Sequence, residues 1–346
     1  MVAVHLCRYE DILPIRSHLD PLTDLVTWLE YYSSVDYVTG LLTERHKVAL
    51  APARQRARSV KPHARLAREY VDQALTGPHD VSFLPLYYGM LNLLKVCVLF
   101  GPYHARLPSN RRHGASYDGY AKNSQSLLTE TVTLHPEGTI PLFYQTITGM
   151  RVARRRSVQL SDVYPFLLGV GAEYQIATGK PSRTVSLRFD IENVGDRPHL
   201  RCFAAQAPGI AVTAAKQLKA LIGFKKNTAG KFMSCPIKEG RPIRSYVRPF
   251  LLCQQVNGTP AAMISGSRFL VPEELPIVLA FFHMSSVVRY KPEFLARLKD
   301  SKYWPLLSTT RRYSLLQFLM AFWSFTHNKT LMINPAPPLG PAVQLM

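Results

Sequence analysis

The stretch "FLPLYYGMLNLLKVCVLF", residues 83–100, has apolar side chains on nearly every side of the helix that it predicts. Pro85 suits the first turn of such a helix, because no backbone N–H is needed from a residue there. Asn92 and Lys95 interrupt the stretch, which is also shorter than the roughly 20 clean apolar residues of a transmembrane helix. The stretch therefore predicts the central helix of a soluble helical bundle.

The chain before this stretch predicts further helices between residues 20 and 76. Asp20 is a good N-cap and Pro21 a good first helical residue, and apolar side chains then recur at helical spacing. Residues 64–77, "ARLAREYVDQALTG", predict a helix with one apolar side that ends at a glycine. The apolar residues of that side are Leu66, Tyr70 and Leu75. Residues 51–63, "APARQRARSVKPH", show no apolar periodicity and predict a basic connector.

Alternating apolar residues predict strands in the middle of the chain. Residues 129–149, "TETVTLHPEGTIPLFYQTITG", alternate on both sides of "HPEG" and predict a β-hairpin or a pair of short strands. Residues 183–205, "RTVSLRFDIENVGDRPHLRCFAA", predict a second hairpin that turns at "VGDRP". Residues 159–179, "QLSDVYPFLLGVGAEYQIATG", predict a helix between the two hairpins, capped by Ser161 or Asp162.

Helical patterns return near the C-terminus. Residues 272–298 predict one helix that ends before Pro292 and another that begins there, and residues 314–328 predict a last apolar helix. We expect an α+β fold, predominantly helical, in which N- and C-terminal helices pack together with a small β-rich unit inserted in the middle. The expected divisions are an N-terminal helical bundle (1–125), a β-rich middle unit with an inserted helix (126–265), C-terminal helices packing on the N-terminal bundle (266–335) and a Pro-rich tail (336–346).

The formal net charge is +19, from 42 Lys and Arg residues against 23 Asp and Glu residues. The arginines are spread from Arg8 to Arg312, which favours a folded basic surface over a disordered basic arm. Such a surface suits a polyanion, which is to say nucleic acid, an acidic protein surface or anionic lipid. We expect nucleic acid, RNA or DNA, as the first partner, a protein partner or homo-oligomer as the second, and no membrane.

The cysteines and the missing motifs bound the chemistry. Five scattered cysteines without a CxxC pair indicate reduced thiols in a cytoplasmic protein and argue against a zinc site. We expect no cofactor, because the chain has no Walker motif, no GxGxxG after a strand, no HExxH and no GxSxG. We also expect no metal, because no group of carboxylates suits a two-metal centre. A metal nuclease, an NTPase and a dehydrogenase are therefore disfavoured.

Five anchors occur in a recognisable order: "LPLYYGMLNLLKVCVLF", "RRHGAS", "LHPEGTIPLFYQ", "LSDVYPFLLGVGAEY" and "ELPIVLAFFHMSSVVRYKPEFL". In these anchors the chain resembles the YaaC-like family of bacterial proteins, in which a YYG helix is followed by a His-Gly and then by an SxxxRYxPE helix. The matching residues are Tyr87, Tyr88, Gly89, His113, Gly114, Ser285, Arg289, Tyr290, Pro292 and Glu293. The resemblance implies a bacterial protein, and relatives in or beside defence gene clusters would suit a sensing or toxic subunit of an antiphage complex.

Arginine–histidine spacing suggests an alternative function, a metal-independent ribonuclease of the HEPN type. In such enzymes a histidine activates the 2′-hydroxyl or protonates the leaving group, and an arginine holds the phosphate. Arg106 and His113 match the spacing, and either Arg106 or Arg112 would hold the phosphate. Arg58 and His63 match the spacing too. A proline inside each pair disfavours a continuous helix through it. The alternative interpretation is a capped turn at the histidine, with the arginines in a solvated loop.

A second candidate site is the helix face that carries His283, Ser286 and Arg289. Its neighbours are apolar, so these polar groups need partners, and Glu293 is one candidate for the arginine. We expect a buried polar network here, or as an alternative a pocket for an anion or nucleotide.

Basic clusters predict where a nucleic-acid backbone would lie. The expected contacts are Arg111, Arg112, Arg151, Arg154, Arg155, Arg156, Lys225 and Lys226. The leading expectation is a non-enzymatic nucleic-acid-binding or effector subunit of a complex. The alternatives are the ribonuclease described above and a scaffold whose basic face docks an acidic partner protein.

Overall fold

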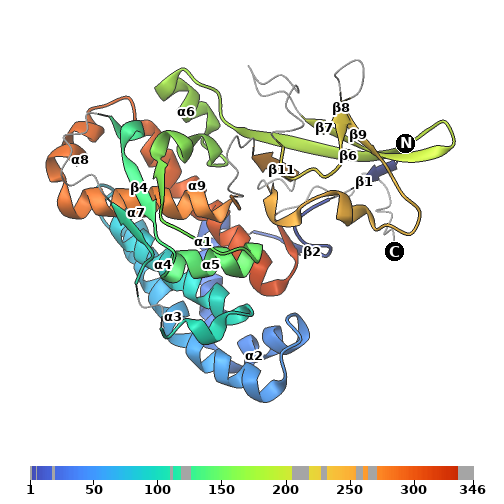
Figure 1. The fold of residues 1–346 in the computed structure, drawn as a ribbon. Helices are drawn as coiled ribbons and strands as arrows, with labels where there is room; N and C mark the ends of the chain where they lie inside the picture. Colours follow the sequence, from blue (N-terminus) through green and yellow to red (C-terminus); the bar gives the residue numbers. More distant parts are fainter. Residues whose placement is uncertain are drawn as a thin grey trace.

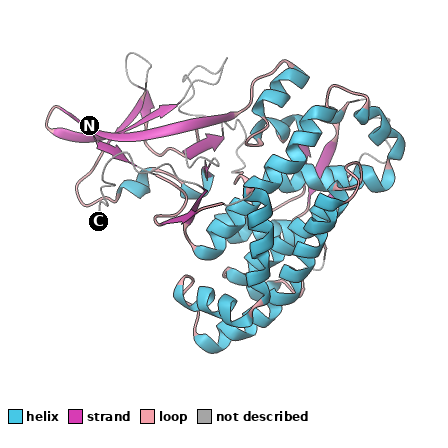
Figure 2. Ribbon diagram, turned by 180° about the vertical axis from the view of Figure 1, so that it is seen from behind, coloured by secondary structure: helices cyan, strands magenta, loops and turns pink. Residues whose placement is uncertain are grey.

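The computed structural model describes residues 2–4, 6–17, 20–109, 112–117, 126–204, 218–226, 232–254, 260–263 and 271–333. The helices form one body, and a twisted sheet lies beside it with a long hairpin reaching away from the helices (Figure 1, Figure 2). This arrangement confirms a predominantly helical α+β fold.

The helices of the described residues are α1 (Pro21–Trp28), α2 (Val35–Glu44), α3 (Leu50–Thr76), α4 (Phe83–Phe100), α5 (Thr139–Thr148), α6 (Gly171–Thr178), α7 (Glu274–Tyr290), α8 (Pro292–Lys299) and α9 (Trp304–His327). The strands are β1 (Val2–Val4), β2 (Ile12–Ile15), β3 (Ala115–Tyr117), β4 (Thr131–Leu134), β5 (Arg156–Gln159), β6 (Thr184–Val194), β7 (Arg197–Ala204), β8 (Lys225–Lys226), β9 (Met233–Pro236), β10 (Leu252–Gln254), β11 (Pro260–Met263) and β12 (Thr330–Ile333). The N- and C-terminal helices pack together as expected, α7 against α4 and α9 against α1.

The central helix α4 is long and apolar enough to cross a membrane, but 78% of it is buried inside the protein. It packs against α3, α5, α7 and α9, so its apolar sides face other helices rather than lipid. This is the environment of a core helix. The prediction of a central helix is confirmed, with its first residue at Phe83 and Pro85 within its first turn.

The prediction of a basic connector over residues 51–63 was wrong. These residues belong to α3, a helix of 27 residues that continues through Pro62. Its buried side consists of Ala53, Ala57, Val60, Ala64, Ala67, Val71 and Ala74. Alanine is the best helix former, but its small side chain is a weak signal of amphipathicity, so the stripe escaped notice. Leu66, expected on the apolar side, is 42% exposed.

Small residues also let α3 and α4 approach closely. A Cβ atom at Gly89 would lie 2.9 Å from Val71 Cγ2 and 3.2 Å from the carbonyl oxygen of Ala67. Both distances are shorter than ordinary van der Waals contact. Gly89, in the YYG sequence, therefore sets the spacing of the two helices that later frame the candidate site.

The hairpin predicted over residues 129–149 was also wrong in its second half. Residues 131–134 form β4, but residues 139–148 form the helix α5. The antiparallel partners of β4 are β5 and β3. Every residue of the helix from Thr139 to Gln145 is buried, so the apolar residues at alternate positions belonged to a continuously buried helix segment.

The helix predicted over residues 159–179 is shorter than expected. Two 3-10 turns, Leu160–Asp162 and Tyr164–Phe166, come first, and α6 begins only at Gly171. The hairpin over residues 183–205 is confirmed as β6 and β7, and the helix break before Pro292 is confirmed between α7 and α8.

The buried residues form two main cores. The larger core joins α1 to α9 with the three-stranded sheet β3–β4–β5, and it includes residues between 127 and 177 that sequence grouping placed with the middle unit. The smaller core lies on the seven-stranded sheet, whose order is β10–β11–β6–β7–β9–β8, with β1 also paired to β6. β2 and β12 form a separate parallel pair.

Candidate functional site

Three anchors of the sequence that lie far apart along the chain meet on the surface of α4. Arg289 on α7 donates a hydrogen bond from Nη1 to the Tyr88 hydroxyl at 3.2 Å. The His113 ring lies with its centroid 5.5 Å from that of Tyr87 and 6.0 Å from that of Tyr88. The YYG helix, the His-Gly turn and the SxxxRY helix therefore form one cluster.

The residues around His113 have a structural task as well. The carbonyl oxygens of Arg112 and His113 accept hydrogen bonds from the backbone N–H groups of Thr139 and Ile140, each at 2.9 Å. These bonds hold the first turn of α5, whose N–H groups have no partner within the helix. The backbone around His113 therefore forms a turn, as the alternative interpretation of this segment expected.

Two glycines make that contact feasible. Gly114 has φ +87° and Gly138 has φ +123°, both in the region that other residues rarely adopt. A Cβ at Gly138 would lie 2.4 Å from Gly114 Cα, closer than any ordinary contact. The "HG" and "HPEG" segments are therefore two halves of one backbone junction.

The charge environment of His113 differs from the predicted one. Burial, then Arg289, then Lys95 lower the pKa of His113 below its usual value, so the ring is neutral near pH 7. Neither cation is one that sequence spacing paired with it. Arg106 donates to the Gln145 side chain on α5 at 2.7 Å, and Arg112 is exposed.

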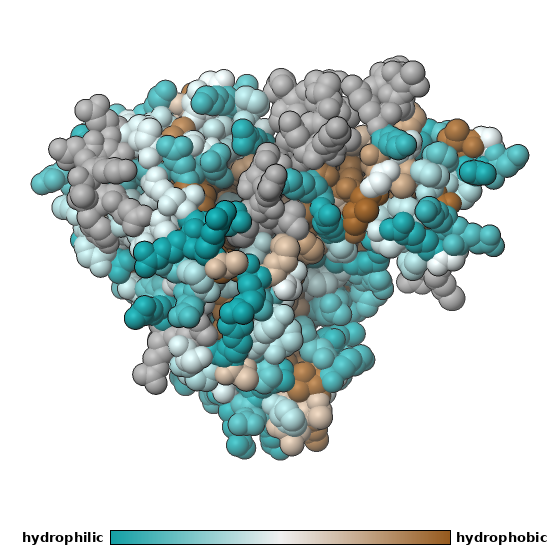
Figure 3. Space-filling model, viewed as in Figure 1, coloured by the Kyte–Doolittle hydropathy of each residue, from teal (hydrophilic) through white to brown (hydrophobic). Residues whose placement is uncertain are grey.

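A basic cavity of about 680 Å³ lies between α3, the second half of α4 and the turn after it. We call it the α3–α4 cavity. Its ionisable lining residues are Arg56, His63, Lys95 and His104, and none of the described residues that line it is acidic. On the face shown in Figure 3, strongly hydrophilic side chains gather over the helical body.

The cations of this cavity are partly desolvated without matching carboxylates. Burial lowers the pKa values of Arg56 and Lys95, and burial together with Lys95 lowers that of His63. Arg56 Nε is buried without a hydrogen-bond partner among the described residues. Unsatisfied buried donors cost free energy that a bound anion would recover.

His63 is held in a defined orientation. The Asn92 amide donates from Nδ2 to the carbonyl oxygen of Tyr88 at 2.9 Å, so its Oδ1 is left to accept from His63 Nδ1 at 2.9 Å. The neutral ring then has Nε2 free of a proton. Because Lys95 acts on both His63 and His113, the cavity and the Tyr88–His113–Arg289 cluster form one basic region.

Other cations of α3 lie outside the cavity lining. Arg58, Lys61 and Arg65 are exposed on α3 and form no ion pair among the described residues, and Lys61 and Arg65 line a separate pocket beside Trp28 and Glu30. Sequence reasoning noted Arg58 and His63 only as a spacing match, because the segment was expected to be a connector. The lysine at position 95, inside a largely apolar helix, was the signal that could have located the cavity.

The predicted face of α7 is a buried polar network. His283 is fully buried, and its Nε2 lies 3.3 Å from Glu130 Oε2. The carboxylate of Glu130 also accepts from the Tyr117 hydroxyl and lies 3.9 Å from Lys291 Nζ. Glu130, which sequence reasoning did not single out, is therefore the centre of the network.

The other residues predicted for that face of α7 lie outside the network around Glu130. Ser286 donates to the carbonyl oxygen of Phe282 at 2.9 Å within the helix, while Arg289 lies at the Tyr88 cluster described above. Glu293 is exposed at the start of α8.

The predicted basic clusters lie on different parts of the protein. Arg151, Arg154 and Arg155 are exposed after α5, and Arg156 begins β5 half-buried. Lys225 is exposed on β8 of the seven-stranded sheet, and the backbone of Lys226 continues that strand. Arg111 lies outside the described residues.

Within the part of the chain that the structure describes, no group of three or more His, Cys, Asp or Glu side chains is arranged to hold a metal ion. No curated protein and no solved structure matches the chain. The family described as YaaC-like Protein matches residues 30–326, which is most of the sequence. The chain therefore belongs to the YaaC-like family.

Proposed function

We propose that this protein binds nucleic acid, with a phosphate of its backbone in the α3–α4 cavity. The observation that carries the proposal is the cavity itself, where Arg56, His63, Lys95 and His104 meet without an acidic lining residue among those described. Partly desolvated cations with unused N–H donors suit phosphate oxygens, because a hydrogen bond between two charged groups is stronger than one between neutral groups.

The distribution of charge supports the same proposal. A net charge of +19 supplies the sequence-independent attraction on which nucleic-acid binding largely depends. Contacts to phosphate fix position without reading bases, so the expected binding is weakly sequence-specific. In this proposal the protein acts as a binding or effector subunit of a larger bacterial complex, with antiphage defence as a fitting role.

A salt titration tests the proposal against docking of an acidic protein. The affinity of the purified protein for a short single-stranded RNA should fall steeply and log-linearly as salt rises. Absence of measurable binding at ~50 mM salt would contradict the proposal, since electrostatic attraction to phosphate is strongest at low salt. Retention of an acidic protein instead of nucleic acid during purification would favour the scaffold alternative.

A metal-independent ribonuclease remains the second candidate, because neutral His113 and His63 lie beside cations. A neutral imidazole can take a proton from a 2′-hydroxyl while a nearby cation stabilises charge on the phosphate. Incubation of total RNA in EDTA should then show cleavage by the parent protein and none by His113→Ala. Equal cleavage by both proteins would remove His113 from the catalytic role.

A further inference from the structure

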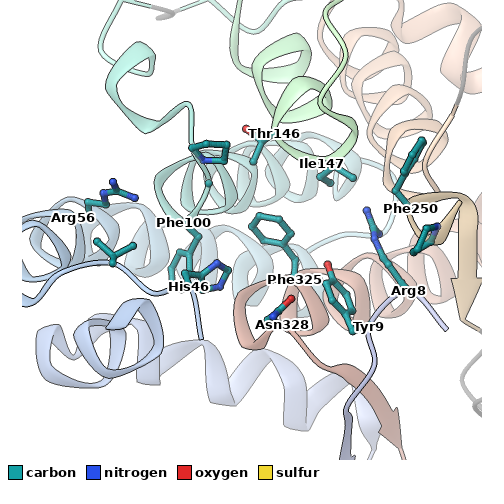
Figure 4. A pocket seen from close by; sticks show the side chains of 14 residues that line it. Arg8, Tyr9, His46, Arg56, Phe100, Thr146, Ile147, Phe250, Phe325 and Asn328 are labelled. Carbon is teal, nitrogen blue, oxygen red and sulfur yellow. The ribbon is translucent and has the colours of Figure 1, made fainter. Parts of the chain in front are cut away.

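A second cavity, of about 540 Å³, lies where the helical body meets the segment before β10. We call it the junction cavity. Its walls come from the ends of α4, α5 and α9, from the segment before β2 and from Phe250 (Figure 4). Its volume is within the range of about 300–1,000 Å³ that small-molecule sites occupy.

Aromatic rings form much of the wall of the junction cavity. Tyr9, Phe100, Phe250 and Phe325 line it. His46 stands edge-on to Phe100, with ring centroids 5.2 Å apart, and its Nε2 lies 2.9 Å from the carbonyl oxygen of Thr326. Burial lowers the pKa of His46, so this ring is neutral as well. Such walls favour a flat, uncharged ring system over a flexible chain.

The two arginines of the cavity differ in what they can bind. Arg8 is ion-paired with Glu274 at 2.5 Å and lies 3.9 Å from Glu273, so its charge is already balanced. Its Nη2 is nevertheless buried without a hydrogen-bond partner among the described residues, which suits a neutral acceptor such as a ring nitrogen or carbonyl.

Arg56 has no carboxylate partner among the ion pairs of the described residues, and its Nε is buried without a hydrogen-bond partner there. It lines both the junction cavity and the α3–α4 cavity. Figure 4 shows Arg56 and Arg8 at opposite ends of the junction cavity, with Phe325 between them. One end is thus suited to an anion, the other to a neutral acceptor, and the middle to an aromatic ring.

We propose that the junction cavity binds a nucleotide, with its base against Phe325 and Phe100 and its phosphate at Arg56. The base acceptors face Arg8 and the Asn328 amide. The nucleotide is either free or the phosphorylated end of a bound strand, and both share this chemistry. This inference rests on the proposed function in one respect, because Arg56 is taken to bind phosphate in both cavities.

The experiment measures two ligands on the same protein. Calorimetry with AMP, and with adenosine and inorganic phosphate as partial ligands, reports on the free nucleotide. Fluorescence polarisation with a short single-stranded RNA, 5′-phosphorylated or 5′-hydroxyl and labelled at its 3′ end, reports on the strand end. Phe325→Leu keeps an apolar side chain but removes the aromatic face, and Lys95→Gln changes the α3–α4 cavity without altering a residue that lines the junction cavity.

Stacking of one base on an aromatic ring contributes about tenfold in affinity or more. We expect Phe325→Leu to weaken AMP binding about tenfold, or to abolish the preference for the 5′-phosphorylated strand, while leaving binding of the 5′-hydroxyl strand unchanged. The first result identifies a free nucleotide as the ligand and the second a strand end. If thermal unfolding shows that Phe325→Leu is not folded, Asn328→Gly is used in its place. Asn328 has φ +51°, a conformation that glycine accepts.

The remaining outcomes separate the two proposals. RNA binding that depends on Lys95, without AMP binding or a 5′-phosphate preference, overturns the junction-cavity inference and leaves the proposed function standing. AMP binding that Phe325→Leu weakens, without RNA binding, overturns the proposed function and supports the nucleotide site. Binding of neither ligand overturns both.

Discussion

Replacing Gly138 with alanine tests the backbone junction that holds His113 and begins α5. The added Cβ would lie 2.4 Å from Gly114 Cα, 2.5 Å from Gly114 N and 2.9 Å from the carbonyl oxygen of Arg112. All three neighbours are backbone atoms, so no side chain can rotate away. The two segments must therefore separate by roughly 1 Å to restore contact distances of about 3.5 Å.

That separation sets the size of the effect. It breaks or stretches the hydrogen bonds that Thr139 and Ile140 donate to the turn, each with a net contribution of about 0.5–1.5 kcal/mol. A residue with a Cβ at φ +123° adds backbone strain of about 1–3 kcal/mol. We expect Gly138→Ala to lower the free energy of unfolding by about 2–6 kcal/mol.

Gly149→Ala is the matched control. Gly149 ends the same helix with φ +73°, and a Cβ there would meet nothing within 4 Å. Only the strain of a left-handed conformation applies, about 1–2 kcal/mol. Urea unfolding followed by circular dichroism measures both variants. Equal losses of stability in the two variants would refute the close approach of Gly138 and Gly114 as the reason for a glycine there.

Two further changes test other parts of the fold. Pro62→Ala should raise the free energy of unfolding by about 1–3 kcal/mol, because an exposed proline inside α3 removes a helical hydrogen bond; an unchanged urea midpoint would count against a continuous α3. Burial lowers the pKa of His327 from 6.5 to about 4, so between these values only the unfolded chain takes up the proton, and stability falls as pH falls. His327→Gln should reduce the loss between pH 7 and pH 4 by on the order of 2 kcal/mol, and an unchanged pH profile of unfolding would contradict this.

The parts of the fold that could be predicted are those with strong local signals. The 83–100 helix is apolar on nearly every side, and the 183–205 hairpin alternates around a glycine turn. The α3 stripe was missed because alanines are also compatible with loops, and only the close approach to α4 shows why small residues are required there. The helix α5 was missed because its buried face is continuous, which local alternation cannot distinguish from a strand.

The candidate site was predictable only in fragments. The order of the motifs along the chain showed that the segments containing Tyr88, His113 and Arg289 belong to one family pattern. It did not show that these segments are in contact. The partners of His113 come from α4 and α7, and spacing along the chain carries no information on such distant contacts. Arg56 and Lys95 gained their significance only when α3 proved to be a helix that lies beside α4.

The measurement that tests the central proposal most directly is the salt dependence of RNA affinity for Lys95→Gln. Its matched control is Lys180→Gln, at an exposed lysine directly after α6, and Figure 1 shows α6 well away from α3. If Lys95 contacts phosphate, Lys95→Gln should weaken binding and reduce the slope of log K against log salt by about 0.7, while Lys180→Gln changes neither. Parent-like affinity and slope in Lys95→Gln would contradict a phosphate in the α3–α4 cavity.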